Sequence, residues 1–166
     1  NIAHAVKIAL NFNISKKVIV KTLPKLSFPG RFNYLKKGRI KKMLHKNELI
    51  MIDGAHSPYD AKNLYNYLKT IKLPKYGIWA MTKNKEPDLF IKEFKNIFKK
   101  IITLPIKNEN SSVSAKELNK IAIKNKINSE TSSSLEEAIR KVSSNEKKLV
   151  VCFGSLYFCG SILNKN

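Results

Sequence analysis

The sequence predicts an α/β fold in which helices cover both faces of an open, mainly parallel, Rossmann-like sheet. Apolar runs of four or five residues recur along the chain, as expected for strands that are buried on both faces. Most of these runs are followed, after a short loop, by a segment whose apolar side chains repeat with a helical period. Such alternation implies right-handed crossovers and therefore parallel neighbouring strands.

Two helices are expected before the sheet begins. Apolar side chains in residues 1–10 recur at helical spacing, and Ser15 is a suitable N-cap for a second short helix that Pro24 ends. Residues 26–30 read as a linker because the Pro29-Gly30 pair is typical of a turn. The linker separates a helical segment from the rest of the chain.

The remaining elements follow from the same two periodicities. Strands are expected at residues 32–35, 40–44, 49–52, 77–81, 101–104, 128–131 and 149–153, with the first two forming a hairpin. Helices are expected to begin at Ser57-Pro58, Pro87, Ser114, Ser134 and Ser155. Ser114 and Ser134 each have a glutamate three residues later, which is the capping-box pattern.

The chain is strongly basic, with 32 Lys and Arg against 12 Asp and Glu and a net charge of +20. A basic nucleic-acid-binding α/β module is therefore one alternative. However, the lysines are spread along the whole chain, and there is no arginine-rich tract or zinc-finger spacing. We interpret the charge as a solvated surface that favours anionic ligands, and we expect no nucleic-acid partner.

Compartment and membrane signals point to the cytoplasm. No apolar run reaches the roughly 18 residues that a transmembrane helix needs, so no membrane partner is expected. The first ten residues lack the features of a signal peptide. Cys152 and Cys159 lie in apolar segments, and we expect two buried, reduced thiols.

The segment Asp53 to Pro58 carries side chains suited to ligand binding at the end of a predicted strand, which is where ligands bind in open α/β sheets. The Asp53 carboxylate can accept hydrogen bonds from two neighbouring hydroxyls, as a ribose offers. Gly54 allows close approach, and the amides near Ser57 favour an anion. His56 can donate to a carboxylate or phosphate. The alternative is that Asp53 caps the turn and His56 is a solvated loop residue.

Two further positions have weaker signals. Gly154 and Ser155 repeat the same strand-end pattern, although N-capping alone explains the serine. Arg31 follows the Pro29-Gly30 turn, and its planar guanidinium can hold a phosphate bidentately. The sequence lacks a G-x-x-x-x-G-K-[ST] phosphate loop, a nucleophile elbow and a cluster with metal-ligand spacing. The chain therefore carries no complete catalytic set.

Four blocks, in this order, resemble the C-terminal domain of folylpolyglutamate synthase/dihydrofolate synthase, in the Mur ligase superfamily. They are FPGRF (28–32), IMIDGAHSPYDA (50–61), MTKNKEPDLFIKEF (81–94) and VVCFGSLYFCGSIL (150–163). The opening NIAHAVKIAL resembles the last long helix of the central ATPase domain of that family. The resemblance implies that residues 1–25 are helices of the central ATPase domain and that residues 26–166 are a Mur ligase-type C-terminal, glutamate ligase domain.

The resemblance also implies an ATP-dependent ligase that joins L-glutamate to folate or dihydropteroate. In the family, ATP phosphorylates a carboxylate, and the amino group of glutamate attacks the acyl phosphate. The C-terminal domain closes over ATP, whereas the P-loop and the Mg²⁺ ligands belong to the central domain. The implied partners are therefore ATP, Mg²⁺, L-glutamate, the folate or dihydropteroate substrate and the P-loop ATPase domain. The chain alone is expected to be inactive, either as a piece of a longer protein or as a non-catalytic remnant.

Individual roles carry over only where residues match the family motifs. The resemblance implies ATP-binding roles for Asn1, Arg31 and Asp53, and glutamate-binding roles for His56 and Ser155. The chain departs from the family at Ser57, where Asn is usual, and at Glu86, where Asp is usual. The first change replaces a side-chain amide by a hydroxyl, and the second keeps the charge.

Overall fold

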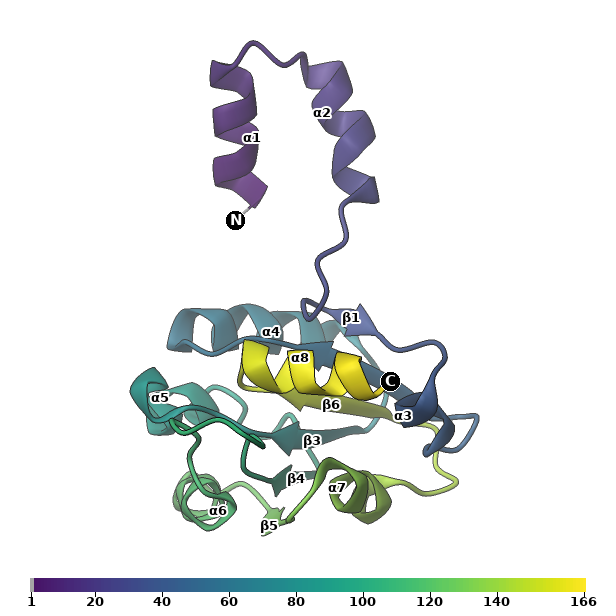
Figure 1. Cartoon of the computed structure of the whole chain (residues 1–166), viewed down its shortest axis with the longest axis vertical. Helices are drawn as coiled ribbons and strands as arrows, with labels where there is room; N and C mark the ends of the chain where they lie inside the picture. Colours follow the sequence, from purple (N-terminus) through teal and green to yellow (C-terminus); the bar gives the residue numbers. More distant parts are fainter. Residues whose placement is uncertain (1) are drawn as a thin grey trace.

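The protein is described here by a computed structural model that covers residues 2–166 (Figure 1). Its sheet has six strands in the order β1-β2-β6-β3-β4-β5. They are β1 (Asn33–Tyr34), β2 (Leu49–Asp53), β3 (Lys75–Trp79), β4 (Lys100–Thr103), β5 (Ser129–Thr131) and β6 (Leu149–Phe153). All neighbours pair in parallel except β1, which is antiparallel to β2. This confirms the predicted mainly parallel α/β sheet.

Eight α-helices accompany the sheet within the described residues. They are α1 (Ile2–Asn11), α2 (Lys16–Thr22), α3 (Arg39–Lys42), α4 (Pro58–Thr70), α5 (Pro87–Lys92), α6 (Ala115–Lys124), α7 (Leu135–Val142) and α8 (Leu156–Lys165), with short 3₁₀ turns η1 (Leu23–Lys25) and η2 (Lys83–Lys85). The predicted serine caps are confirmed. The hydroxyls of Ser15, Ser57, Ser114 and Ser134 each accept a hydrogen bond from the amide three residues later.

Six of these helices, α3 to α8, form two layers, one on each face of the sheet. Side chains of α3, α7 and α8 pack with Ile50, Ile52, Ile78 and the other residues of that face in one apolar core. Side chains of α4, α5 and α6 pack with the residues of the opposite face, such as Met51, in a second core. Burial on both faces explains why the central strands are continuous apolar runs.

Two sequence expectations for the strands are wrong. The predicted hairpin is absent, because residues 33–34 pair with β2 and residues 39–42 form the helix α3 instead of a returning strand. Asn166 accepts hydrogen bonds from the amides of Arg39 and Ile40, which satisfies the first turn of a helix here, and Ile40 and Leu44 are buried in the same core. The strand expected at residues 77–81 lies two residues earlier, at Lys75–Trp79.

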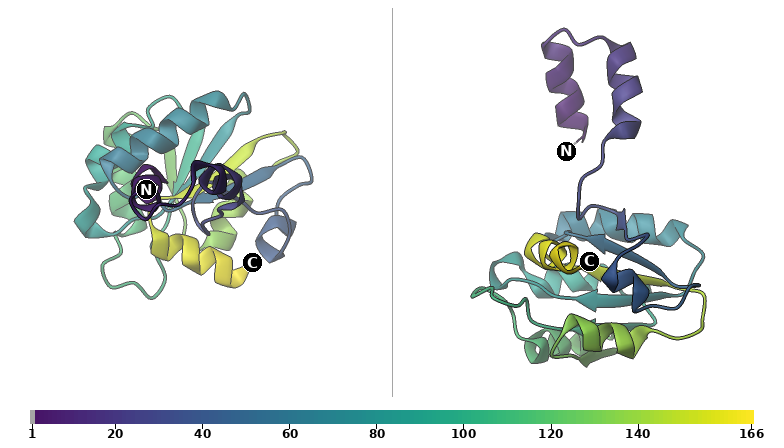
Figure 2. Two further views of the ribbon diagram at one scale, coloured as in Figure 1. Left: turned by 90° about the horizontal axis from the view of Figure 1, so that it is seen from above. Right: turned by 45° about the vertical axis from the view of Figure 1, so that its right-hand side comes forward.

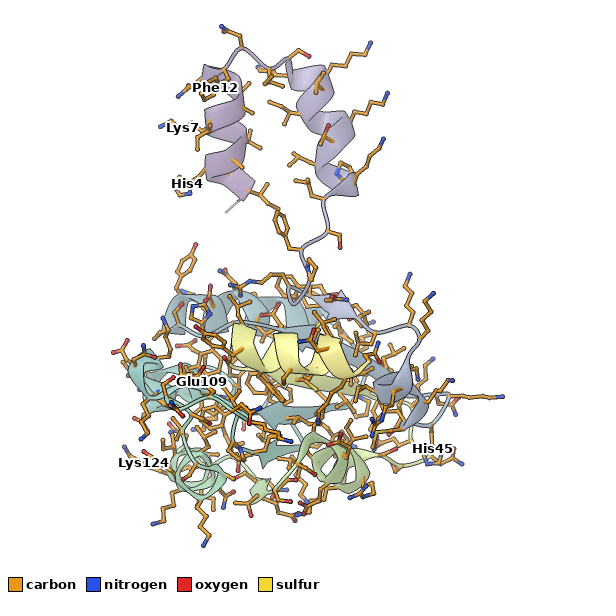
Figure 3. The ribbon with its side chains drawn as sticks, in the orientation of Figure 1. His4, Lys7, Phe12, His45, Glu109 and Lys124 are labelled. Atoms are coloured by element: carbon orange, nitrogen blue, oxygen red, sulfur yellow. The ribbon has the colours of Figure 1, made fainter. Side chains whose placement is uncertain are left out.

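The helices α1 and α2 stand away from the α/β body and are joined to it by a single stretch of chain (Figures 1 and 2). Neither helix contains a buried residue. Several of their apolar side chains are exposed, among them Ile2, Ile8, Val18 and Val20. His4 and Lys7 of α1, and Phe12 just after it, project on the side away from α2 (Figure 3). Within residues 2–166, no helix is long and apolar enough to cross a membrane.

A buried ion pair joins the loops that precede β2 and β6. The Lys148 Nζ lies 3.3 Å from the Glu48 Oε1, and both side chains are almost completely buried. The Glu48 carboxylate also accepts hydrogen bonds from the Ser143 hydroxyl and from the amides of His45 and Ser144. Burial raises the pKa of Glu48, but these hydrogen bonds outweigh it and the pKa is lowered overall. The network fixes the end of the sheet opposite the candidate site.

Candidate functional site

Three turns meet at the carboxyl end of the sheet. The amide of Gly54, just after β2, donates a 2.7 Å hydrogen bond to the carbonyl of Gly30. A Cβ placed on Gly54 would lie 2.3 Å from the Leu156 side chain, and one on Gly30 would lie 3.1 Å from the Cβ of Cys159. Asp53 is also directly opposite Phe153 in the register of β2 and β6. The segments that carry Arg31, Asp53 and Ser155 are therefore packed together at one edge.

Arg31 and Asp53 form the charged part of this edge. The Arg31 Nη1 lies 3.8 Å from the Asp53 Oδ1, and the exposed fractions of the two side chains are 37% and 3%. Burial raises the pKa of Asp53, while hydrogen bonds from the backbone and the charge of Arg31 partly oppose the increase. The guanidinium is open to a ligand, whereas the carboxylate is largely enclosed.

The Asp53 carboxylate also organises the backbone around it. Its Oδ2 accepts a 2.8 Å hydrogen bond from the Phe32 amide, and its Oδ1 accepts one of 2.8 Å from the Ala55 amide. Both oxygens are thus engaged, so the turn-capping alternative describes part of what Asp53 does. Each oxygen has a further lone pair, but only 3% of the side chain is exposed.

Phe32 was not singled out by the sequence. It has a φ of +43°, in the left-handed region that bulky residues rarely adopt. The hydrogen bond that the Phe32 amide donates to the Asp53 carboxylate holds this conformation, and the ring packs on Tyr67 with centroids 4.6 Å apart. The Tyr67 hydroxyl in turn lies 3.2 Å from that of Tyr34. An aromatic cluster therefore adjoins Arg31 and Asp53, although no local sequence pattern brings its members together.

His56 is oriented by its own loop and by α4. Its Nδ1 lies 2.7 Å from the Gly54 carbonyl, which can only accept, so Nδ1 carries the proton. The Asp60 carboxylate lies 3.7 Å from the same nitrogen and 3.4 Å from the His56 amide. Asp60 also occupies the third position of α4, where an acidic side chain is favourable, and it was not predicted as a site residue.

The other predicted residues differ in accessibility. Ser155 is 3% exposed, and its hydroxyl accepts a hydrogen bond from the Tyr157 amide as the N-cap of α8. Asn1 lies outside the described residues. The geometry therefore brings Arg31 and Asp53 into direct contact, with Ser155 enclosed beneath the same edge.

A cleft of about 1010 Å³ lies between the α1–α2 pair and the α/β body. Arg31 and Asp53 line it together with Phe28, Phe32 and Tyr59, whereas His56 and Ser155 are not part of its described lining. Within residues 2–166, no group of three or more His, Cys, Asp or Glu side chains is placed to hold a metal ion. The cleft offers a guanidinium, aromatic rings and carboxylates, a combination suited to an anionic ligand with a planar group.

Comparisons with known proteins identify one family and one fold. A family model described as "Dihydrofolate synthetase, C-terminal domain" matches residues 36–165, which is most of the chain. No curated protein matches the chain. Solved structures with the same fold include E. coli FolC in complex with DHPP and ADP, at 16% identity with a TM-score of 0.73. They also include a bifunctional folylpolyglutamate synthase/dihydrofolate synthase from Yersinia pestis CO92, at 20% identity with a TM-score of 0.73.

A third structure with this fold is a Mycobacterium tuberculosis folylpolyglutamate synthase complexed with ADP and AMPPCP, at 16% identity with a TM-score of 0.73. These three matches each cover 90% of the present chain. They cover only 34%, 34% and 35% of the solved chains, so the present chain spans about a third of their length. The likeness confirms the expected fold. It carries no information on the roles of individual residues, because the identities are this low.

Proposed function

The chain belongs to the dihydrofolate synthetase C-terminal domain family, and on that premise we propose that it is the C-terminal domain of an ATP-dependent folate–glutamate ligase. The proposed enzyme joins L-glutamate to folate or dihydropteroate through an acyl phosphate. The observation that carries the proposal is the contact between Arg31 and Asp53 at the cleft, beside the turn that holds Ser155.

Arg31 is the proposed ligand of the ATP phosphates. The Arg31 guanidinium is the more accessible group of the pair, and the buried Asp53 carboxylate restrains its orientation from the side of the protein. The remaining lone pairs of Asp53 are proposed to accept a hydroxyl of the nucleotide. Bidentate, charge-assisted hydrogen bonds from an arginine of this kind hold a phosphate at a defined angle.

His56 and Ser155 are the proposed glutamate-binding residues, and Asn1 is proposed to lie near the adenine. The enclosed position of Ser155 favours an indirect role, in which its hydroxyl fixes the first turn of α8 and the free amides there face the carboxylate. His56 is proposed to contribute its outer nitrogen, because Nδ1 is committed to the Gly54 carbonyl.

Residues 1–25 are proposed to be the end of a central ATPase domain, and residues 26–166 the glutamate ligase domain. The exposed apolar side chains of α1 and α2 support this division, because a stable helix pair normally buries its apolar face. The P-loop and the Mg²⁺ ligands are proposed to reside in that central domain, so the chain alone is inactive. The proposed setting is the cytoplasm, consistent with two free, buried thiols at Cys152 and Cys159.

Closure of this domain over ATP is the proposed mechanical step. When Arg31 meets the phosphates, the cleft loses water, and an acyl phosphate formed there is protected from hydrolysis. The amine of glutamate then attacks the acyl carbon, and inorganic phosphate leaves. The single chain segment that joins α2 to the body allows such a movement.

The test is a ligation assay in a protein that joins this chain to a P-loop domain upstream of Asn1. Arg31→Ala and Asp53→Ala are each expected to lower glutamate incorporation at least about 100-fold, the loss typical of removing a charged group from a transition-state site. Arg140→Ala, at an exposed position on α7, is the matched control and should retain activity. Full activity in both site variants would refute the proposal.

A simpler measurement uses the chain itself. ATP should bind weakly, because the P-loop supplies most of the phosphate contacts, and amide NMR shifts should be confined to residues 30–32 and 53–57. Arg31→Ala should abolish these shifts while the rest of the spectrum is unchanged. Shifts that persist in Arg31→Ala would place the nucleotide elsewhere.

A further inference from the structure

Two carboxylates line the cleft, and they differ in how the protein uses them. Asp53 and Asp60 are the acidic residues of its described lining. The Asp53 side chain is 3% exposed, and its oxygens accept hydrogen bonds from two backbone amides beside the Arg31 guanidinium. The Asp60 side chain is 27% exposed. Asp60 is therefore the carboxylate that a ligand in the cleft can reach.

The contacts of Asp60 with the rest of the protein are long. Its Oδ2 lies 3.4 Å from the amide nitrogen of His56 and 3.7 Å from the Nδ1 of the same residue. Within residues 2–166, its Oδ1 accepts no hydrogen bond. The His56 ring has a closer partner in the Gly54 carbonyl, 2.7 Å from Nδ1, so orienting this ring does not require Asp60. The Asp60 carboxylate keeps acceptor capacity that the protein does not use.

The backbone holds Asp60 at a fixed position. Asp60 lies in the first turn of α4, where its amide donates a 3.1 Å hydrogen bond to the Ser57 hydroxyl. The neighbouring Ala61 and, one turn later, Leu64 are buried in the core of that face of the sheet. The carboxylate thus projects from a rigid element, which reduces the entropy lost when a ligand binds to it.

Asp60 places a negative charge in positive surroundings. Arg31 and Lys36 line the same cleft, and the whole chain has a net charge of +20. These cations attract an anionic ligand, whereas the Asp60 carboxylate repels one. Burial is the main reason that the pKa of Asp53 is raised, and the charge of Asp60 adds to the increase, so the two carboxylates are close enough to interact. A ligand that suits all of these groups carries a cationic group as well as anionic ones.

We propose that Asp60 binds the α-ammonium group of the amino acid that the enzyme joins to its other substrate. The inference rests on the proposed function, which brings an amino acid to this cleft and assigns the outer nitrogen of His56 to it. An ammonium group has three donors and no acceptor, and its hydrogen bonds to a carboxylate are charge-assisted. His56 and Asp60, four residues apart across the start of α4, then recognise the opposite charges of one zwitterion.

This contact gives Asp60 a defined role in specificity. The nitrogen that Asp60 holds is the atom that forms the new amide bond. A dicarboxylic acid of the same length but without the amine has nothing to offer Asp60, and it leaves the carboxylate facing a second negative charge. The site therefore selects an amino acid over the corresponding dicarboxylic acid.

The experiment titrates the ¹⁵N-labelled chain with L-glutamate and with glutarate, which has the same carbon skeleton and both carboxylates but no amine. L-Glutamate should shift the amides of residues 54–60 and bind at least about tenfold more tightly than glutarate, the difference expected for one charge-assisted hydrogen bond. Equal binding of the two compounds, or no shift with either, would overturn the proposal.

Asp60→Asn separates ammonium binding from a role in positioning His56. The variant should bind L-glutamate about tenfold more weakly and glutarate at least as tightly as the wild type, because a repelling charge has been removed. Opposite changes of this kind cannot come from a misfolded variant. If Asp60 serves only to position His56, both compounds lose affinity together, and that result would overturn the proposal.

Two further variants serve as controls for the charge. Asp88→Asn removes the same charge from the first turn of α5, outside the described lining of the cleft, and should alter the binding of neither compound by more than about twofold. Asp60→Glu keeps the carboxylate and should retain the preference for L-glutamate. A preference lost equally in Asp88→Asn would show a general effect of charge and overturn the proposal.

The ATP titration described above keeps this inference distinct from the proposed function. ATP shifts at residues 30–32 and 53–57 that accompany equal binding of L-glutamate and glutarate contradict the inference alone. A preference for L-glutamate without any ATP shifts contradicts the nucleotide role of Arg31 and leaves Asp60 as part of an amino-acid site. In the protein joined to a P-loop domain, Asp60→Asn should raise the KM for glutamate about tenfold and leave the KM for ATP unchanged.

Discussion

Leu156, at the start of α8, fills the space that a side chain on Gly54 would need. A Cβ on Gly54 would lie 2.3 Å from Leu156 Cδ2 and 2.8 Å from its Cγ. Although 101 positions separate the two residues in the sequence, their contact fixes the spacing of the two strand ends that carry Asp53 and Ser155.

Gly54→Ala should therefore destabilise the protein by about 1–3 kcal/mol, the cost of overpacking. Urea denaturation gives the change in the free energy of unfolding. Leu156 is 47% exposed, so Leu156→Ala alone should cost less, and the double variant should recover most of the stability lost in Gly54→Ala. Additive losses in the double variant would show that the two residues do not compete for space.

Gly154→Ala and Gly160→Ala should have opposite effects. Gly154 has a φ of +109°, and a Cβ there would lie 2.5 Å from the Ala80 carbonyl oxygen. This substitution should cost about 3–5 kcal/mol, because backbone strain and a clash with the main chain add together. Gly160 is helical and a Cβ there meets nothing within 4 Å, so alanine should stabilise by about 0.5–1 kcal/mol. Thermal unfolding of the two variants measures both effects, and equal melting temperatures would contradict the turn geometry at Gly154.

Glu48 should make the stability depend on pH in the acid range. Its pKa is lowered in the folded state, so the folded protein binds fewer protons here than the unfolded chain. The stabilisation is complete above the ordinary pKa of about 4.5 and is lost as the pH falls through the lower, folded value. Denaturant unfolding of wild type and Glu48→Gln from pH 7 to pH 3 measures the free energy of unfolding of each protein. The difference between the two free energies should shrink as the pH falls.

At pH 7, Glu48→Gln should cost about 3 kcal/mol, since it leaves the Lys148 ammonium group buried without its counter-charge. Glu136→Gln is the control, because Glu136 pairs with Lys165 at the surface and should contribute less than 1 kcal/mol. If Glu48→Gln lowers the free energy of unfolding by the same amount at every pH down to 3, titration of the Glu48 carboxyl does not contribute to the pH dependence.

Removing residues 1–25 should leave the α/β body folded. No side chain of α1 or α2 is buried, so the free energy of unfolding of residues 26–166 should lie within about 0.5 kcal/mol of that of the whole chain. The isolated segment 1–25 should show little helix by circular dichroism, because helices this short are marginal alone. Loss of cooperative unfolding in residues 26–166 would contradict the domain boundary.

The helix caps and the buried strands could be predicted because each is specified by residues close together in the sequence. The serine caps at Ser114 and Ser134 were identified from a glutamate three positions later, and the cap at Ser57 from the proline that follows it; the three hydrogen bonds are present. The buried strands were identified from their apolar runs. The helix α3 was missed because its cap comes from Asn166, 126 positions away from Ile40 in the sequence.

The candidate site was predictable only in part, for the same reason. Arg31 and Asp53 each follow a recognisable turn or strand, and the structure brings them together. The conformation of Phe32 and its contact with Tyr67 depend on the Asp53 carboxylate and on the packing of α4, which leave no short-range pattern. The enclosure of Ser155 depends likewise on how the turns pack.

The position of β6 has a consequence for how the chain acquires its structure. This last strand lies in the middle of the sheet, where it pairs with β2 on one side and β3 on the other. During synthesis the two halves of the sheet have no partner for their inner edges until residue 153 has emerged. Contacts between residues so far apart in sequence slow folding, so we expect assembly to be late and exposed to aggregation.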